Sequence, residues 1–109
     1  MAIDKEAYFK ERMDVVDSLY DVIDPELFVN IVDLGLLYGI EIDNINLKIT
    51  VTMTFSTKAC PLGDAIKEGV WNALGASHPE YEVDIDIVWD PEFVLEMLSD
   101  EGRLQLGMG

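Results

Sequence analysis

The chain has 109 residues, of which half are hydrophobic and 27% are charged, a composition typical of a globular protein with one hydrophobic core. Its 22 acidic and seven basic residues give a formal net charge of −15. Nucleic acids and anionic membrane surfaces bind clusters of lysine and arginine, and no such cluster occurs, so both are disfavoured as partners. The acidity itself favours solubility, with a basic partner or a metal ion as the sharper interpretation.

The cysteine count and the first residues bear on the compartment. A single cysteine, Cys60, cannot form an internal disulfide, and the chain contains no long apolar run. Asp4 and Glu6 stand where a signal peptide would be basic. We therefore expect a cytoplasmic protein whose residues 1–109 form one domain.

The first half of the chain predicts a helix, a bend and two strands. Apolar residues at steps of four and three predict an amphipathic helix over residues 5–20, and the proline of Asp24-Pro25 stops it. Residues 30–35 predict a bend with a short extended piece. Alternating residues predict strands over 36–42 and 47–55, joined by a turn. The apolar residues of the helix pattern are Phe9, Met13, Val16, Tyr20 and Ile23. The second strand is expected to place Leu47, Ile49, Val51, Met53 and Phe55 on the core side and Lys48, Thr50, Thr52 and Thr54 on the other.

The second half predicts a helix over residues 62–74 that ends at Gly75, a third strand and a short helix near 93–98 followed by a tail. The third strand is expected to turn Val83, Ile85, Ile87 and Trp89 toward the core. The order helix, strand, strand, helix, strand predicts an α/β (α+β) two-layer sandwich. Its small mixed sheet would have helices on one face and a solvated face rich in threonine, aspartate and glutamate.

Cys60 stands where the second strand is expected to run into the second helix. Pro61 suits the first helical position, which places Cys60 at or near the N-cap. There the helix dipole and the free backbone N–H groups favour a thiolate, suited to a nucleophile or a metal ligand. The alternative is a small buried residue without chemical function. The hydroxyls of Ser56 and Thr57 could donate to a thiolate or cap the turn.

Two further segments carry unusual chemistry. In Asp24-Pro25-Glu26, the carboxylates either form an Asx-type turn that stops the helix or join Cys60 in a metal site or an acid/base pair. Asp33 lies in an apolar run and must find hydrogen-bond donors, most simply the backbone N–H groups of its own bend. Gly35 is expected to have a positive φ. We interpret the segment around these last two residues as structural.

Taken together, these segments resemble the SufT/PaaD-like family of iron–sulfur cluster assembly domains. The matching pieces are residues 24–26, 29–36, 53–54 with 60–61, 88–91 and 102–107, and they span most of the chain from Val15 onward. The resemblance implies that the key thiol falls on Cys60, the acidic pair on Asp24 and Glu26, and the hydroxyl pair on Ser56 and Thr57. The chain departs from the family pattern at Ser56, usually threonine, at Lys58, usually proline, and at Glu92-Phe93, usually Pro-Trp.

The resemblance implies an accessory or adaptor factor in iron–sulfur cluster assembly or metalloprotein maturation, and not an enzyme. Its partners would be iron–sulfur assembly proteins or client apo-proteins, and Cys60 would be a transient ligand of iron or of a cluster. One thiol cannot supply the four cysteine ligands typical of a cluster, so stable binding would need a homodimer, a partner or a small thiol.

Two other functions stay open. Cys60 could be the nucleophile of a thiol-dependent enzyme, although Asp24 and Glu26 are normally too acidic to serve as its base. His78 is expected at the far end of the second helix, which argues against a cysteine–histidine dyad. The chain could also be a pure protein-interaction module with an inert cysteine.

The position of Cys60 makes its reactivity testable. We predict that the thiol is accessible and that its pKa lies below the unperturbed value of about 8.5, because a helix start favours the thiolate. Alkylation of the native protein with iodoacetamide, followed against pH by mass spectrometry, measures this pKa. A value at or above about 8.5 would falsify the activated thiolate.

Overall fold

The computed structural model describes residues 5–25, 27–55 and 63–107, in which no helix is long and apolar enough to cross a membrane. The elements follow one another as α1 (Lys5–Leu19), α2 (Ile31–Leu34), β1 (Leu37–Asp43), β2 (Lys48–Met53), α3 (Gly63–Ser77), β3 (Glu82–Ile87), a 3₁₀ turn η1 (Leu95–Met97) and α4 (Asp100–Gln105). The predicted order of the three strands and two long helices is confirmed. Two short helices, α2 and α4, stand where a bend and a tail were expected.

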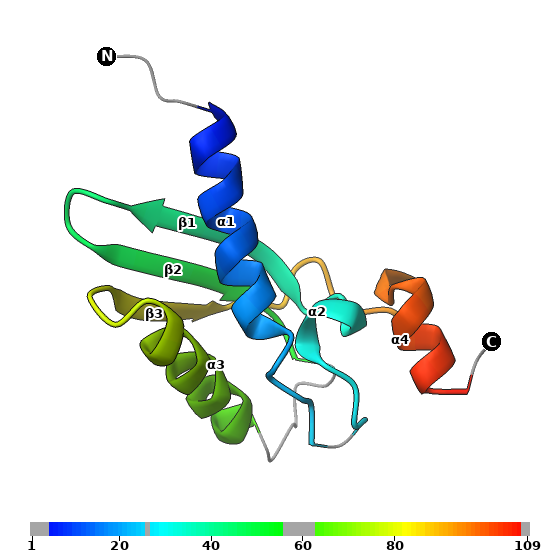
Figure 1. Cartoon of the computed structure of the whole chain (residues 1–109). Coiled ribbons are helices and arrows are strands. Elements are labelled where there is room, and N and C mark those ends of the chain that lie inside the picture. Colours follow the sequence, from blue (N-terminus) through cyan, green and yellow to red (C-terminus); the bar gives the residue numbers. More distant parts are fainter. Residues whose placement is uncertain (1–4, 26, 56–62, 108–109) are drawn as a thin grey trace.

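The described sheet has the strand order β1-β2-β3. β1 pairs antiparallel with β2 in a hairpin, and β2 pairs parallel with β3 after the crossover through α3. Helices α1 and α3 lie side by side on one face of the sheet (Figure 1). This is the predicted two-layer α+β arrangement with a mixed sheet.

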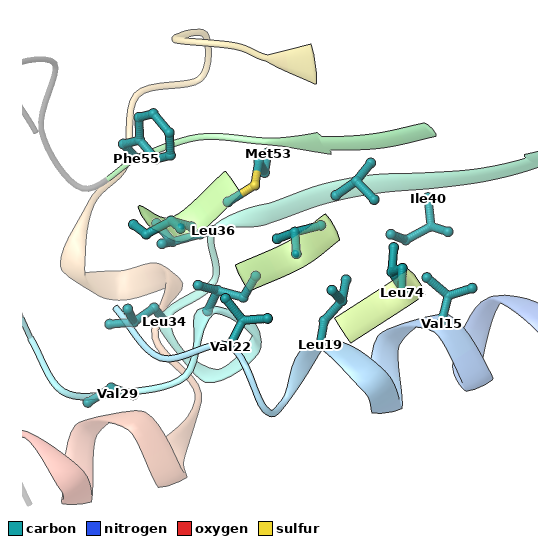
Figure 2. Close-up of a cluster of buried hydrophobic side chains, with 14 of the residues drawn as sticks. Val15, Leu19, Val22, Val29, Leu34, Leu36, Ile40, Met53, Phe55 and Leu74 are labelled. Atoms are coloured by element: carbon teal, nitrogen blue, oxygen red, sulfur yellow. The ribbon is translucent and has the colours of Figure 1, made fainter. Parts of the chain in front are cut away.

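The core lies between the two long helices and the sheet. Figure 2 shows side chains from α1, from the strands and from α3 converging there. The alternation of β2 predicted its core side correctly, because Ile49, Val51 and Met53 are all fully buried. The helices contribute Val15 and Leu19 from α1 and Ile66, Val70 and Leu74 from α3.

The predicted apolar face of α1 is largely exposed, and of its residues only Val16 packs against the core. Phe9 is 63% exposed and Met13 is 40% exposed, and Tyr20 and Ile23 are also exposed. The helix instead faces the core through Val15 and Leu19, and Val22 continues that line beyond its end. Apolar residues flank α1 on two sides, and only contact with α3 and β1 decides which side is buried.

Several element ends also differ from the expectation. Helix α3 runs through Gly75 to Ser77, because the His78 N–H still donates to the Leu74 carbonyl (2.7 Å) before Pro79 ends the helix. A bulge between Leu37 and Gly39 interrupts the predicted alternation of β1. The other residues on an unexpected side are Leu47, exposed in the turn, Trp89, 36% exposed, and Thr54, fully buried.

The C-terminal segment packs against α2 beside the sheet (Figure 1). Leu98 is buried in the core, and Ser99 is the N-cap of α4, accepting a hydrogen bond from the Gly102 N–H (2.9 Å). A Cβ atom on Gly102 would lie 2.7 Å from the Asp33 carbonyl oxygen, so this close approach requires glycine. Val94 and Leu104 remain exposed.

The two helical glycines Gly102 and Gly75 give a matched stability test. Gly102→Ala should destabilise the fold by about 1–3 kcal/mol, because the added methyl forces α4 away from Asp33. Gly75→Ala meets no atom within 4 Å and should stabilise by about 0.5–1 kcal/mol through helix propensity. Urea unfolding measures both, and equal effects of the two substitutions would contradict the close packing of α4.

Candidate functional site

The structure describes Asp24, Asp33 and Gly35 among the predicted site residues. Five predicted site residues lie outside the described residues: Glu26, Ser56, Thr57, Cys60 and Pro61. The expected closeness of the Asp24 and Glu26 carboxylates to the Cys60 sulfur therefore stays a prediction. The two ends of the stretch that carries Cys60, Phe55 and Gly63, lie next to each other. A Cβ on Gly63, the first residue of α3, would lie 2.8 Å from the Phe55 ring, so residues 55 and 63 are in direct contact.

Asp24 organises the turn that follows α1. Its side chain is fully buried, and its Oδ1 atom accepts a hydrogen bond from the Leu27 N–H (3.1 Å). Its backbone N–H donates to the Val29 carbonyl (2.9 Å), and its carbonyl accepts from the Phe28 N–H (2.8 Å). The predicted Asx-type turn is therefore present, and it holds a carboxylate inside the protein in one fixed position.

Phe28 stands out in this turn. It has a φ of 60°, which an aromatic residue rarely adopts, and its side chain is 79% exposed. The left-handed conformation costs roughly 1–2 kcal/mol for a residue with a Cβ, so the hydrogen bonds of Asp24 on both sides must hold it there. No pattern in the sequence marks this position, because the residue type does not favour a positive φ.

Asp33 finds donors other than those expected. Its Oδ2 atom accepts from Asn30 Nδ2 (2.7 Å) and its Oδ1 atom accepts from the Ser99 hydroxyl (2.8 Å). The backbone N–H groups of its own bend are already used, since Leu34 and Gly35 donate to the carbonyls of Asn30 and Val32 in α2. The expectation that backbone N–H groups of the bend supply the donors is therefore wrong, although the Asn30 side chain of the same bend supplies one of them.

Gly35 has the expected positive φ, 81°, and is the C-cap of α2. Its N–H closes the helix on the carbonyls of Ile31 and Val32. A Cβ at this position would overlap the Met97 carbonyl oxygen, so glycine is also needed for the approach of η1. The positive φ was predictable from the sequence, whereas the contact with a residue far along the chain was not.

Three further residues shape the region and were missed by sequence reasoning. Asn30 is the N-cap of α2, with Oδ1 accepting from the Asp33 N–H (2.8 Å), and its spacing to Asp33 is a capping signal. Ser99 before Asp100-Glu101 is a similar signal for α4. Thr54, just after β2, is fully buried, and its hydroxyl has no hydrogen-bond partner among the described residues.

The described residues hold no ready-made metal centre. No group of three or more histidine, cysteine, aspartate or glutamate side chains within residues 5–25, 27–55 and 63–107 could bind a metal ion. A site in this chain with three or more such ligands would therefore need at least one ligand outside these residues.

Comparison with known proteins assigns the fold and the family. A solved structure of a domain of unknown function from Bacillus anthracis superposes with a TM-score of 0.89 at 32% identity, covering 97% of this chain and 100% of that one. Residues 12–86 match the iron-sulfur cluster assembly protein family, and the chain belongs to this family. The matched residues include Asp24, Asp33 and Cys60.

Two named bacterial relatives align with this chain over almost their whole length. The Fe-S protein maturation auxiliary factor of Porphyromonas gingivalis is 36% identical over 100 residues, covering 92% of this chain and 94% of that protein. The Fe-S protein maturation auxiliary factor SufT of Staphylococcus aureus is 36% identical over 87 residues, covering 80% of this chain and 98% of that protein. The resemblance found in the sequence is thereby confirmed.

The turn at Asp24 gives a stability prediction. Asp24→Ala removes the acceptor for the Leu27 N–H and should lower the free energy of unfolding by about 1–3 kcal/mol. Asp24→Asn keeps an oxygen at the same place and should cost less than half as much. Asp21→Ala, at an exposed neighbouring acid, is the control and should have little effect. A loss for Asp24→Ala no larger than that of the control would show that the turn does not need this side chain.

Proposed function

We propose that this chain is an accessory factor in the maturation of iron–sulfur proteins, in which Cys60 binds iron or a cluster transiently before transfer to a client apo-protein. The family match across residues 12–86 carries the proposal, together with relatives that are named maturation auxiliary factors. The partners would be iron–sulfur assembly proteins and client apo-proteins. A chain with one cysteine suits a reducing compartment, and we propose the cytoplasm.

Three observations on the described residues support this proposal. Phe55 and Gly63 meet, which brings together the two ends of the stretch that carries Cys60. The buried hydroxyl of Thr54 adjoins the start of that stretch. The Asp24 turn holds a carboxylate rigidly, two residues before Glu26. We propose that Ser56, Thr57, Asp24 and Glu26 tune the thiol and its cargo.

A single thiolate suits transfer better than storage. An iron–sulfur cluster is usually held in a protein by four cysteine thiolates in total, so Cys60 supplies one bond and other molecules supply the rest. Handover is then a ligand exchange without any redox change. A client thiol loses its proton and forms a bond to iron, the bond from iron to Cys60 breaks, and the Cys60 sulfur takes up a proton.

The test is Cys60→Ser in cells that lack their own copy of the gene. We expect the activity of a [4Fe–4S] enzyme to fall about tenfold or more, because even the loss of a residue that orients a metal ligand costs about 10–100-fold, and Cys60→Ser removes the proposed ligand itself. The cellular amount of the variant and its thermal unfolding should be unchanged. Ser77→Ala, at the exposed end of α3, is the control and should preserve enzyme activity.

Two results would separate the alternatives. Full enzyme activity with Cys60→Ser would overturn the ligand proposal and favour a pure interaction module. Reconstitution of the purified chain with ferrous iron and sulfide under anaerobic conditions supplies a second measurement. The wild-type protein should gain iron absorbance with an added small thiol, and the Cys60→Ser protein should not.

A further inference from the structure

The face of the sheet opposite α1 and α3 carries an ordered array of charge. The strand register places its residues in three rows across the sheet, with one residue from each strand in every row. These nine residues, called the open face below, are Gly39, Thr52 and Asp86, then Glu41, Thr50 and Asp84, then Asp43, Lys48 and Glu82. Figure 1 shows that α1 and α3 leave this face uncovered.

The acids of the open face lie only on the outer strands. Glu41 and Asp43 stand on β1, and three more acids stand on β3. Each outer strand therefore carries a line of acids along its length, and the two lines lie about 10 Å apart. The central strand between them carries Lys48 and two threonines. Neighbouring strands therefore do not set like charges directly opposite each other, which would destabilise the sheet.

Lys48 neutralises only a small part of this charge. Its ammonium group pairs with Asp84 (2.7 Å), and both side chains are about half exposed, at 42% and 48%. The hydrogen bond to Asp84 and the charge of Asp84 raise the pKa of Lys48, and the charges of Glu82 and Asp86 act in the same direction. The field of the open face thus favours a cation at its centre.

The open face is more acidic than the helical layer on the other side of the sheet. The open face has five acids and one base among nine residues, a net charge of −4. Helices α1 and α3 together have six acids and four bases among 30 residues, a net charge of −2. Solubility alone does not require such a difference between the two layers.

A pocket at the outer edge of β1 adjoins the open face. A shallow pocket of about 360 Å³ is lined by Tyr8 from α1 and by Glu41, Ile42, Asp43, Lys48 and Thr50. The Tyr8 hydroxyl accepts a hydrogen bond from the Ile42 N–H (3.4 Å), which holds the phenol over the outer edge of β1. Two carboxylates in the wall of a pocket suit a guanidinium, whose planar N–H groups bind carboxylates in pairs.

We propose that the open face binds a cationic segment of a partner protein. An arginine- and lysine-rich chain would lie along β2, between the line of acids on β1 and the line of acids on β3, with one guanidinium in the pocket at Glu41 and Asp43. The separation of the carboxylates favours charges spread along a peptide over one compact metal ion, and no cluster of three or more candidate metal ligands occurs among the described residues. The proposal does not depend on the chemistry of Cys60.

An octa-arginine peptide is the probe, with octa-glutamine as the uncharged control. The open-face variant Glu41→Gln/Glu82→Gln/Asp86→Asn removes three exposed acids that accept none of the described hydrogen bonds. The helix-layer variant Asp14→Asn/Asp17→Asn/Glu68→Gln changes the net charge equally on the other side. Fluorescence anisotropy at low and physiological salt gives the affinities, and urea unfolding checks that both variants fold.

We expect the open-face variant to bind octa-arginine roughly tenfold more weakly, because each lost ion pair contributes a modest, additive amount. The helix-layer variant should lose less than about threefold, through the general field alone. Backbone amide shifts on peptide addition should concentrate in β1, β2 and β3. Equal losses in the two variants, or shifts centred on α1 and α3, would overturn the proposal. Competition by Mg²⁺ beyond that of NaCl at equal ionic strength would also overturn it, in favour of a metal site.

Discussion

The buried carboxylate of Asp33 joins two parts of the chain that the sheet does not connect. It accepts hydrogen bonds from Asn30 and from Ser99, which lies 66 residues further along. Its carbonyl oxygen also accepts the Ser99 N–H (2.7 Å). A buried polar group that loses a hydrogen-bond partner destabilises the fold by about 1–3 kcal/mol, so each of these groups needs the others. The Asp33 side chain and carbonyl therefore help to hold the C-terminal segment in place, together with the burial of Leu98.

The same network reaches the candidate site. Helix α2 has only four residues and could not be stable alone, because a single turn does not repay its nucleation cost. The Asn30–Asp33 pair fixes it, and Asn30 also forms a β-bridge with Ile23, the residue before Asp24. Ser99 is thereby linked through Asp33 and Asn30 to the turn that holds the buried Asp24 carboxylate. A stable C-terminal segment and a fixed Asp24 turn are consequences of the same contacts.

Sequence patterns correctly predicted the features that depend on neighbouring residues in the chain. Alternation in β2 identified its core side, and the need for a left-handed C-cap identified Gly35. The buried face of α1 was predicted wrongly because apolar residues flank the helix on two sides and tertiary packing chooses between them. The hydrogen bond from Ser99 to Asp33 could not be predicted, since nothing near Ser99 in the sequence specifies a residue so far away. Cys60, Glu26, Ser56 and Thr57 lie outside the described residues, so their arrangement stays a prediction.

The proposed ligand exchange at Cys60 and the proposed docking of a partner on the open face would serve two separate steps of cargo transfer. One thiolate gives one bond to the cargo, so the complex with a client has to form quickly, align and separate again. Complementary charges raise the rate of encounter and fix orientation more than they raise affinity. Complexes held by solvent-exposed charge pairs therefore dissociate readily. Hydrophobic contacts of equal area would hold the partner longer. An acidic open face with net charge −4 therefore suits a factor whose cargo must leave with its partner.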